Sequence, residues 1–360
     1  MCQRHGGHRR GLILGVAWWR RCLQNRPSAA LSIVNAKKSF NVRCKIVFAA
    51  ALVLAAPGGR AAEAWPANYA ALGKLIVTQF VTAPFPHPAR AEGHKYRTNF
   101  FSAAEHYSDR TVAMFIPKNF HATDKIDFVV HFHGWGNTVA GTLAGYKLIE
   151  QFCDSGRNAV LIVPAGPHNA SDSFGGKLED TNGFKIFMGE AMEKLLASGA
   201  LENLERRSPT RLVAGLKRAV PEAGAPQIGS VILSGHSGGY HVMAAILDHG
   251  GMADKIKEAW LFDALYGGTE NFVAWQKNEH GRLLDIYTGH GGTKAESETL
   301  MAFFLTNGVS FFAAEDTNAV PENLRTNKIV FLHTGMAHND VVAKRGTFGQ
   351  FLKSSCLQNQ

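Results

Sequence analysis

Apolar and polar residues alternate along most of the chain in two different ways. Short apolar runs rich in β-branched and aromatic residues are typical of buried strands, and apolar residues near a 3.6-residue period are typical of amphipathic helices. Strands are predicted at 111–116, 127–133, 159–164, 230–233, 258–262, 283–287 and 328–333. Helices are predicted at 142–152, at 184–197, directly after residue 239, at 297–305 and at 347–353. This alternation predicts an α/β fold, a single domain with a mostly parallel central sheet of about eight strands and helices on both faces.

One serine lies in a setting that packing alone does not require. The stretch from Gln227 to Met243 reads QIGSVILSGHSGGYHVM and contains the GxSxG sequence 235–239. A strand, a tight turn and a helix around such a sequence are the context of a nucleophile elbow, in which the flanking glycines permit close backbone packing. A GxSxG sequence can occur by chance in a glycine-rich chain, so the motif alone is weak evidence. The strand before it and the helix after it are the reason to predict that Ser237 is a catalytic nucleophile.

A serine nucleophile needs a base within hydrogen-bond reach, and parallel sheets place such groups at the carboxyl ends of their strands. His338 lies in a loop after the strand predicted at 328–333, and we predict that it is the base. His333 is expected to be a buried histidine bonded to its neighbours. His236, inside the elbow, is expected to point away from the serine.

Two carboxylates are candidates for the acid that orients this base. Asp263 directly follows the strand predicted at 258–262, whereas Asp285 falls inside the strand predicted at 283–287. A carboxylate at a strand end can reach an imidazole, so Asp263 is the predicted acid. Asp285 remains the alternative acid, and Asp340 is a weaker one.

The strand predicted at 127–133 ends in a glycine-rich turn, His133-Gly134-Trp135-Gly136. A turn with glycines on both sides of one residue leaves a main-chain N–H free to stabilise an oxyanion. We predict an oxyanion hole formed by the N–H groups of Trp135 and Gly238. Trp135 is also a candidate wall of the substrate pocket.

GxSxG after a strand, an HGxG turn upstream and the chain order serine, acid, histidine resemble the α/β-hydrolase superfamily. The order of strands and helices resembles that of the superfamily over nearly all of the chain after residue 64. The position of the acid departs from the superfamily pattern. Members most often carry the acid after the strand predicted here at 283–287, and Asp263 comes one strand earlier. The resemblance also implies that the helix after the oxyanion strand and the C-terminal helix pack on the same face of the sheet, and with it a disulfide between Cys153 and Cys356.

The first 64 residues differ from the rest in charge. They hold eleven of the 38 Lys and Arg residues but one of the 29 acidic residues, which leaves 27 basic and 28 acidic residues in 65–360. The basic pI near 9.3 therefore belongs to this leader, and no nucleic-acid partner is expected. A basic flank, the apolar run 46–56, a Pro-Gly-Gly breaker and Ala62-Glu63-Ala64 predict a secretory signal peptide cleaved near Ala64.

We therefore predict a secreted or periplasmic protein whose catalytic domain is 65–360, with no stable membrane span after cleavage. Residues 1–41 are an unusual prefix for a signal, and one interpretation is a misplaced start with the true beginning near Val42. A buried first helix and a twin-arginine signal at Arg9-Arg10 are weaker interpretations. Cys153 and Cys356 are the two cysteines after the leader, too few for a four-ligand structural zinc site.

Together these features predict a serine hydrolase that cleaves an ester-type acyl bond in a small-molecule or acylated substrate, without a cofactor or a metal. Amide or peptide cleavage by the same residues is the near alternative. A metal-dependent hydrolase using His131 and His133, which alternate on one strand, is a second alternative, and a non-catalytic binding protein is a third. The irregular stretch 166–183 is a candidate loop over the site, and the sequence contains no signal for the substrate or the oligomeric state.

Overall fold

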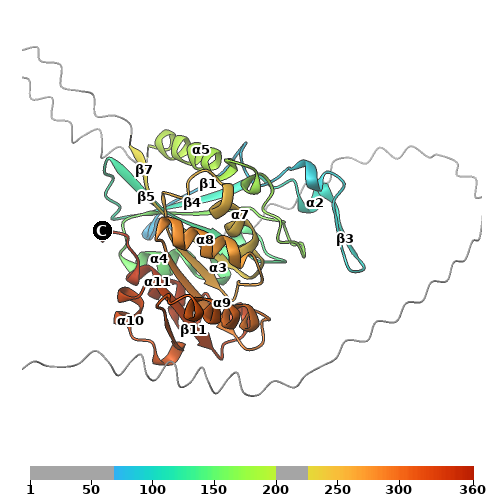
Figure 1. The fold of residues 1–360 in the computed structure, drawn as a ribbon. Helices are drawn as coiled ribbons and strands as arrows, with labels where there is room; N and C mark the ends of the chain where they lie inside the picture. Colours follow the sequence, from blue (N-terminus) through green and yellow to red (C-terminus); the bar gives the residue numbers. More distant parts are fainter. Residues whose placement is uncertain (1–68, 200–225) are drawn as a thin grey trace, which may run out of the picture. The chain divides into compact units, whose positions relative to one another are not determined.

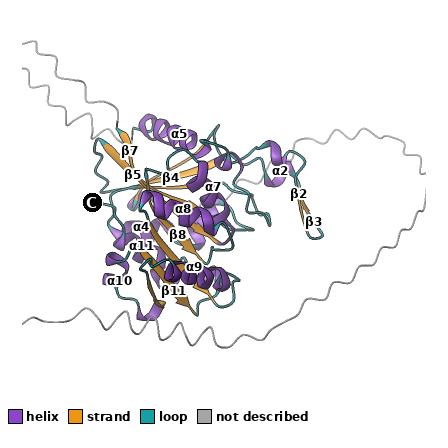
Figure 2. Cartoon of the chain, viewed as in Figure 1, coloured by secondary structure: helices purple, strands orange, loops and turns teal. Residues whose placement is uncertain are grey.

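The computed structural model describes residues 69–199 and 226–360, and the leader with its predicted signal peptide lies outside them. In this part of the chain one sheet of nine strands has the order β1-β4-β6-β5-β7-β8-β9-β11-β10 (Figures 1 and 2). All neighbours from β6 to β10 are parallel, and β4 pairs antiparallel with both β1 and β6. The strands are β1 (Gly73–Gln79), β4 (Thr111–Pro117), β5 (Lys125–Phe132), β6 (Val160–Pro164), β7 (Gln227–His236), β8 (Ile256–Phe262), β9 (Arg282–Thr288), β10 (Phe312–Glu315) and β11 (Ile329–Thr334).

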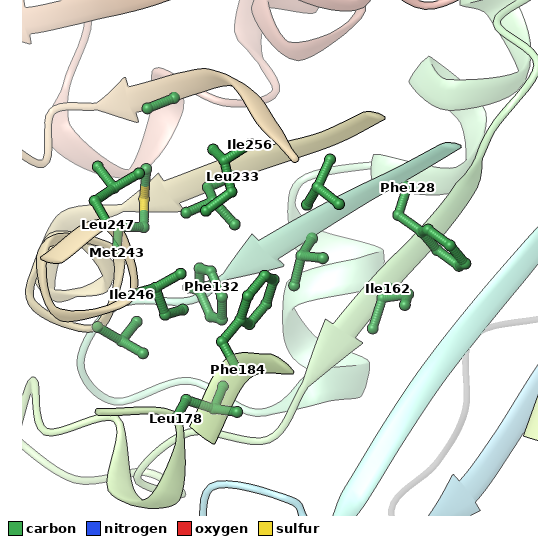
Figure 3. Close-up of a cluster of buried hydrophobic side chains, with 14 of the residues drawn as sticks. Phe128, Phe132, Ile162, Leu178, Phe184, Leu233, Met243, Ile246, Leu247 and Ile256 are labelled. Atoms are coloured by element: carbon green, nitrogen blue, oxygen red, sulfur yellow. The ribbon is translucent and has the colours of Figure 1, made fainter. Parts of the chain in front are cut away.

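Helices cover both faces of this sheet, and each face has its own apolar core. One core packs the first face against α5 (Gly183–Ala197), α7 (Tyr240–His249), α8 (Thr269–Glu279) and α9 (Lys294–Thr306). Figure 3 shows part of this core, with Phe128 and Phe132 of β5, Phe184 of α5 and Met243 of α7. The other core packs the second face against α3 (Val139–Gly145), α4 (Leu148–Ser155), α10 (Pro321–Thr326) and α11 (Thr347–Ser354). Central strands buried on both faces explain the continuous apolar runs in the sequence.

The predicted α/β class is confirmed, with nine strands in the central sheet of the described part rather than about eight. One predicted helix was wrong: 142–152 is two helices, because Lys147 adopts a left-handed conformation with φ 49° between α3 and α4. Strands β1 and β10 are half-buried and lack a long apolar run, so periodicity did not predict them. A short hairpin, β2 (His94–Tyr96) and β3 (Asn99–Phe101), is followed by α2 (Ala103–His106).

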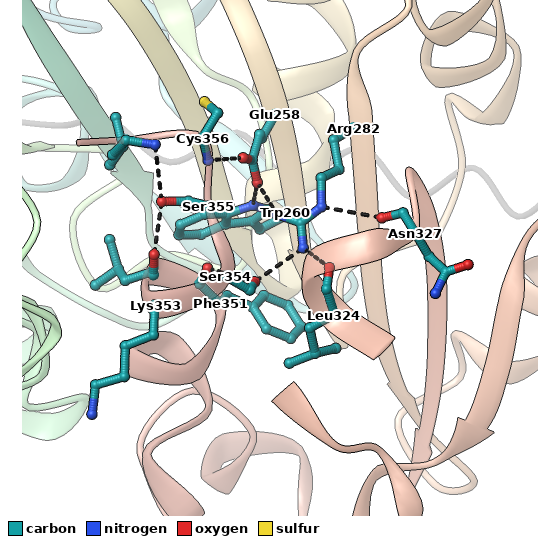
Figure 4. Close-up of polar contacts among 12 residues, drawn as sticks. Glu258, Trp260, Arg282, Leu324, Asn327, Phe351, Lys353, Ser354, Ser355 and Cys356 are labelled. Carbon is teal, nitrogen blue, oxygen red and sulfur yellow. Dashed lines mark hydrogen bonds and ion pairs between the residues drawn. The ribbon is translucent and has the colours of Figure 1, made fainter. Parts of the chain in front are cut away.

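The edge of the sheet where β8 and β9 begin carries a buried ion pair that fastens the C-terminal segment (Figure 4). Glu258 is 1% exposed, and its Oε2 accepts from Arg282 Nη1 at 2.6 Å and from Trp260 Nε1 at 2.8 Å. Its Oε1 accepts from the Cys356 N–H at 2.6 Å, and Arg282 also donates to Ser354 Oγ at 3.0 Å. A carboxylate removed from water is tolerated here because every partner donates to it.

The predicted disulfide was wrong, although the predicted helix packing is correct. Helices α4 and α11 pack against each other, and Gln151 of α4 accepts from the Gly349 N–H of α11 at 3.0 Å. Cys153 and Cys356 are nevertheless free thiols. The Cys153 thiol donates to the Leu72 carbonyl oxygen at 3.8 Å, whereas the main-chain N–H of Cys356 donates to Glu258, so the two cysteines have different partners.

The described ranges contain no helix that is both long enough and apolar enough to cross a bilayer. The prediction of a signal peptide is not tested by these residues.

Candidate active site

Ser237 lies at the tip of a turn that joins the central strand β7 to α7 through a 3₁₀ turn, Ser237–Gly239. Its φ of 53° is in the left-handed region, which a non-glycine residue adopts only when its surroundings fix it. The neighbouring glycines provide the necessary space. A Cβ on Gly239 would lie 2.7 Å from the Phe132 carbonyl oxygen, and one on Gly134 would lie 2.6 Å from the Ser237 Cβ. The GxSxG glycines therefore bring the turn against the end of β5.

His338 begins a 3₁₀ turn, His338–Asp340, that follows strand β11, and Asp263 directly follows β8. His338 Nδ1 donates to Asp263 Oδ2 across 2.6 Å. The carboxylate is fully buried, whereas the His338 side chain is 30% exposed. Ser237 and His338 line the same cavity. His338 thus binds Asp263 and lines the same cavity as Ser237, and the three residues lie at the carboxyl ends of β11, β8 and β7.

The buried Asp263 is held by the loop that follows β9. The Thr288 N–H donates to its Oδ1 at 3.0 Å, the Thr288 hydroxyl donates to its Oδ2 at 2.8 Å, and the Thr293 hydroxyl also donates to Oδ1. Burial raises the pKa of this carboxyl, but the hydrogen bonds from His338, Thr293 and Thr288 outweigh it and hold the pKa below its usual value. Strand β9 and the loop after it therefore supply two threonines that bind a carboxylate at the end of the neighbouring strand β8.

Asp285, the alternative acid, faces a helix and has no histidine partner. It is fully buried in β9, and its Oδ2 accepts from Ser297 Oγ of α9 at 2.6 Å. Its Oδ1 has no hydrogen-bond partner. Burial raises the pKa of Asp285 to about 7, with a smaller contribution from the Asp263 charge. Asp340 forms an exposed ion pair with Lys344 at 3.1 Å.

His236 supports the backbone of His338. Its Nε2 lies 3.0 Å from the His338 carbonyl oxygen and its Nδ1 lies 2.8 Å from the Tyr146 hydroxyl. The carbonyl can only accept, so Nε2 carries the proton and Nδ1 accepts from Tyr146. Burial lowers the pKa of His236 to about 4, with a further lowering by the His338 charge, so the ring is neutral near pH 7. The rings of His236 and His338 lie 4.6 Å apart.

The turn after β5 forms one side of the cavity. The Gly136 N–H donates to the Ala170 carbonyl at 3.0 Å, which fixes the turn on the far side of Trp135. Gly238 lies in the first turn of its 3₁₀ segment, where an N–H has no partner within the helix. A Cβ on Gly238 would lie 2.8 Å from Trp135 Cδ1, so the two predicted oxyanion residues are in direct contact.

The stretch 166–183 borders the cavity and is fastened at several points. Ser173 Oγ accepts from Trp135 Nε1 at 2.7 Å, and the Asn169 N–H donates to the Asn137 carbonyl at 3.1 Å. Asp172 receives two hydrogen bonds from Arg90, at 2.7 and 3.1 Å, and one from Tyr107 at 3.0 Å. The predicted loop over the site is thus an ordered wall beside the oxyanion turn.

The histidines of the alternative metal site have other partners. His131 is buried, and its Nδ1 lies 2.8 Å from Ser234 Oγ. His133 Nε2 accepts from the Gly166 N–H at 2.9 Å, and its Nδ1 donates to the Gly134 carbonyl at 2.8 Å. Over 69–199 and 226–360, no group of three or more His, Cys, Asp or Glu side chains could hold a metal ion. His333, also expected to be satisfied by neighbours, pairs with Glu315 at 2.8 Å.

Several residues of the site carry no sequence signal of their own. Thr288 and Thr293 hold the acid, Tyr146 orients His236, and Tyr266 and Tyr240 line the cavity beside Ser237. Burial raises the pKa of Tyr266 to about 12, so it keeps its proton at neutral pH. A tyrosine three residues after the predicted acid was the one hint available before the structure.

No known family profile matches the chain, and no curated protein sequence matches it. Among solved structures, the chain is similar to a mutant feruloyl esterase module of Clostridium thermocellum complexed with sinapinate, at 11% identity over 79% of this chain and 88% of that one, with a TM-score of 0.43. A fluorophosphonate-binding serine hydrolase of Staphylococcus aureus matches at 10% identity over 78% and 99%, with a TM-score of 0.41. An esterase of Pyrobaculum calidifontis matches at 14% identity over 69% and 81%, with a TM-score of 0.38.

These three solved structures are named as two esterases and a serine hydrolase.

Proposed function

We propose that the protein is a serine hydrolase that cleaves an ester-type acyl bond. The observation that carries the proposal is the 2.6 Å hydrogen bond from His338 Nδ1 to the buried Asp263, beside a cavity that Ser237 shares. This bond leaves His338 Nε2 unprotonated in the neutral ring, so that it can take a proton from the Ser237 hydroxyl. The left-handed conformation of Ser237 supports a nucleophile elbow rather than an ordinary turn.

In the proposed reaction the Ser237 oxygen attacks the acyl carbonyl while His338 takes the hydroxyl proton. The oxyanion of the tetrahedral intermediate accepts hydrogen bonds from the N–H groups of Trp135 and Gly238. His338 then gives the proton to the departing alcohol, and water repeats the sequence to release the acid and restore the serine. Asp263 keeps Nδ1 protonated and stabilises the imidazolium. Ester cleavage is favoured over amide cleavage because the alkoxide is the better leaving group.

A fluorophosphonate probe tests this proposal, because it reacts covalently with activated serines. We expect the wild type to be labelled on Ser237 and the Ser237→Ala variant to remain unlabelled. Ser173→Ala is the matched control, since it removes another serine hydroxyl from the same cavity and should leave labelling at Ser237. Equal labelling of the wild type and Ser237→Ala, or a folded wild type that does not react, would contradict the proposal and favour a non-catalytic binding protein.

We further propose that the enzyme is exported, because the leader carries the charge and apolar pattern of a signal peptide. Expression of the full chain with a C-terminal tag, followed by N-terminal sequencing of the exported protein, tests this. A mature N-terminus at or near Trp65 is the expected result. An unprocessed protein retained inside the cell would refute it.

A further inference from the structure

The cavity beside Ser237 has a volume of about 870 Å³, enough for a substrate of drug size. Among the residues that the structure describes, no Asp, Glu, Lys or Arg lines it. The lining is Trp135, Gly136, Asn137, Gly141, Gly145, Tyr146, Ser173, His236, Ser237, Gly238, Tyr240, Tyr266, His338 and Asn339. A charged substrate group entering this cavity would lose its water without meeting an opposite charge, which costs free energy. The lining therefore selects for uncharged substrates.

Aromatic rings form much of this lining. Trp135 is 44% exposed and Tyr266 is 36% exposed, high values for large aromatic side chains. Their polar atoms already have protein partners, because Trp135 Nε1 donates to Ser173 and the Tyr266 hydroxyl donates to the Gly291 carbonyl. What these two residues present to the cavity is consequently ring surface, which binds planar or apolar groups.

Glycines form another part of the lining. Gly141 and Gly145 are four residues apart in α3 and so lie on the same face of that helix. A Cβ on Gly145 would have no atom within 4 Å, and the same holds for Gly136. The missing side chains leave open volume and flat backbone surface next to the catalytic serine.

We propose that this cavity binds an uncharged ester with a planar aromatic group, and that Gly145 sets the size of the group that fits. The inference rests on the proposed hydrolase function and specifies its substrate class. Rings of the substrate contact the exposed ring surface of Trp135 and Tyr266, and the glycine face of α3 leaves them room. An added side chain at position 145 points into this volume without displacing the protein.

The Gly145→Val variant tests the role of the glycine face. We measure kcat/KM for 4-nitrophenyl benzoate and 4-nitrophenyl acetate, which share a leaving group and differ in acyl size. The benzoate-to-acetate ratio should fall at least tenfold, because the isopropyl group occupies volume that the phenyl ring needs. Gly189→Val is the matched control: Gly189 lies within α5, its Cβ also has no atom within 4 Å, and it does not line the cavity. The control should keep the wild-type ratio.

The charge preference is tested on the wild type with the 4-nitrophenyl ester of 4-carboxybenzoic acid, which adds one negative charge to the benzoate ring. We expect at least a tenfold lower kcat/KM than for the benzoate. Equal rates for the two esters, or an unchanged ratio in Gly145→Val, would overturn the inference while fluorophosphonate labelling of Ser237 still supported the hydrolase. Absence of both labelling and turnover would refute the proposed function itself, and the inference with it.

Discussion

Replacing Asp263 with Asn removes the charge that orients His338 while keeping the size of the side chain. The wild-type carboxylate accepts from His338 Nδ1 at 2.6 Å and from the Thr288 N–H and the hydroxyls of Thr288 and Thr293. An asparagine at 263 would place its oxygen where Oδ1 lies, accepting from the Thr288 N–H and the Thr293 hydroxyl. Its NH₂ group would lie where Oδ2 lies, facing His338 and the Thr288 hydroxyl oxygen, which would then accept instead of donate. His338 Nδ1 must then accept, and the proton moves to Nε2.

That tautomer cannot take a proton from Ser237, so the change removes the base and not only its orientation. The analogous substitution in a Ser-His-Asp protease lowers kcat about 10⁴-fold, which corresponds to about 5.4 kcal/mol of transition-state stabilisation. We expect a loss of the same order here, because Asp263 is fully buried and water cannot take its place beside His338.

The assay is ester hydrolysis under saturating substrate, together with the rate of fluorophosphonate labelling at Ser237. Asp285→Asn is the matched control, since it makes the same chemical change in a buried carboxyl that binds Ser297 and not His338. We expect Asp285→Asn to keep kcat within about fivefold of wild type, a much smaller change than the loss of about 10⁴-fold expected for Asp263→Asn. An Asp263→Asn enzyme with more than a tenth of wild-type kcat, or an Asp285→Asn enzyme as impaired as Asp263→Asn, would refute the assignment of the acid.

Three further predictions concern groups around the site and the sheet edge. Because the pKa of Asp285 is raised to about 7, the folded state binds the proton of this carboxyl more tightly than the unfolded state does. The stability that the protonated Asp285 contributes is full below about pH 4 and is lost as the pH rises to about 7. Urea unfolding should show Asp285→Asn gaining stability relative to wild type between pH 5 and 8, and a constant difference across that range would contradict this. His236→Phe removes the hydrogen bonds to the His338 carbonyl and to Tyr146. Because a lost hydrogen bond that positions His338 is worth about 1.5 kcal/mol, kcat should fall about tenfold or more with little change in KM. His236→Gln can still donate to that carbonyl and should recover part of kcat, whereas no recovery would argue for a packing role. Glu258→Gln leaves Arg282 buried without its counter-charge and should lower the free energy of unfolding by about 3–5 kcal/mol. The kcat of the folded fraction should stay unchanged, because this edge of the sheet is remote from Ser237. A change in the free energy of unfolding below about 1 kcal/mol would mean that the ion pair is not isolated from water.

The sequence determined the fold class and the main part of the candidate site. The spacing of apolar residues in a strand or helix follows from which face of the segment is buried, so it can be read from the residues of that segment alone. For the same reason the elbow was readable: a strand, GxSxG and a helix are contiguous, and the elements found at 227–236 and 240–249 surround Ser237 as predicted. His338 and Asp263 were readable as strand-end residues, because parallel strands share one carboxyl edge.

Only the tertiary structure decided which of these residues meet. Asp263 rather than Asp285 contacts His338 because the order β8-β9-β11 and its register place the Thr288 loop around the first carboxylate and a helix over the second. Such contacts join positions up to 75 residues apart, and residue periodicity carries no information about strand order or register.

The two cysteines illustrate the same limit. Their helices lie on the same face of the sheet, as the resemblance implied, but the Cys153 thiol donates to the Leu72 carbonyl and the main-chain N–H of Cys356 donates to Glu258. The lining of the cavity, which has no Asp, Glu, Lys or Arg among the described residues, likewise comes from six separate parts of the chain. They are the turn after β5, α3, the 166–183 stretch, the elbow, the loop after β8 and the loop after β11. Local sequence determines which elements form, whereas the packing of distant elements determines what faces Ser237.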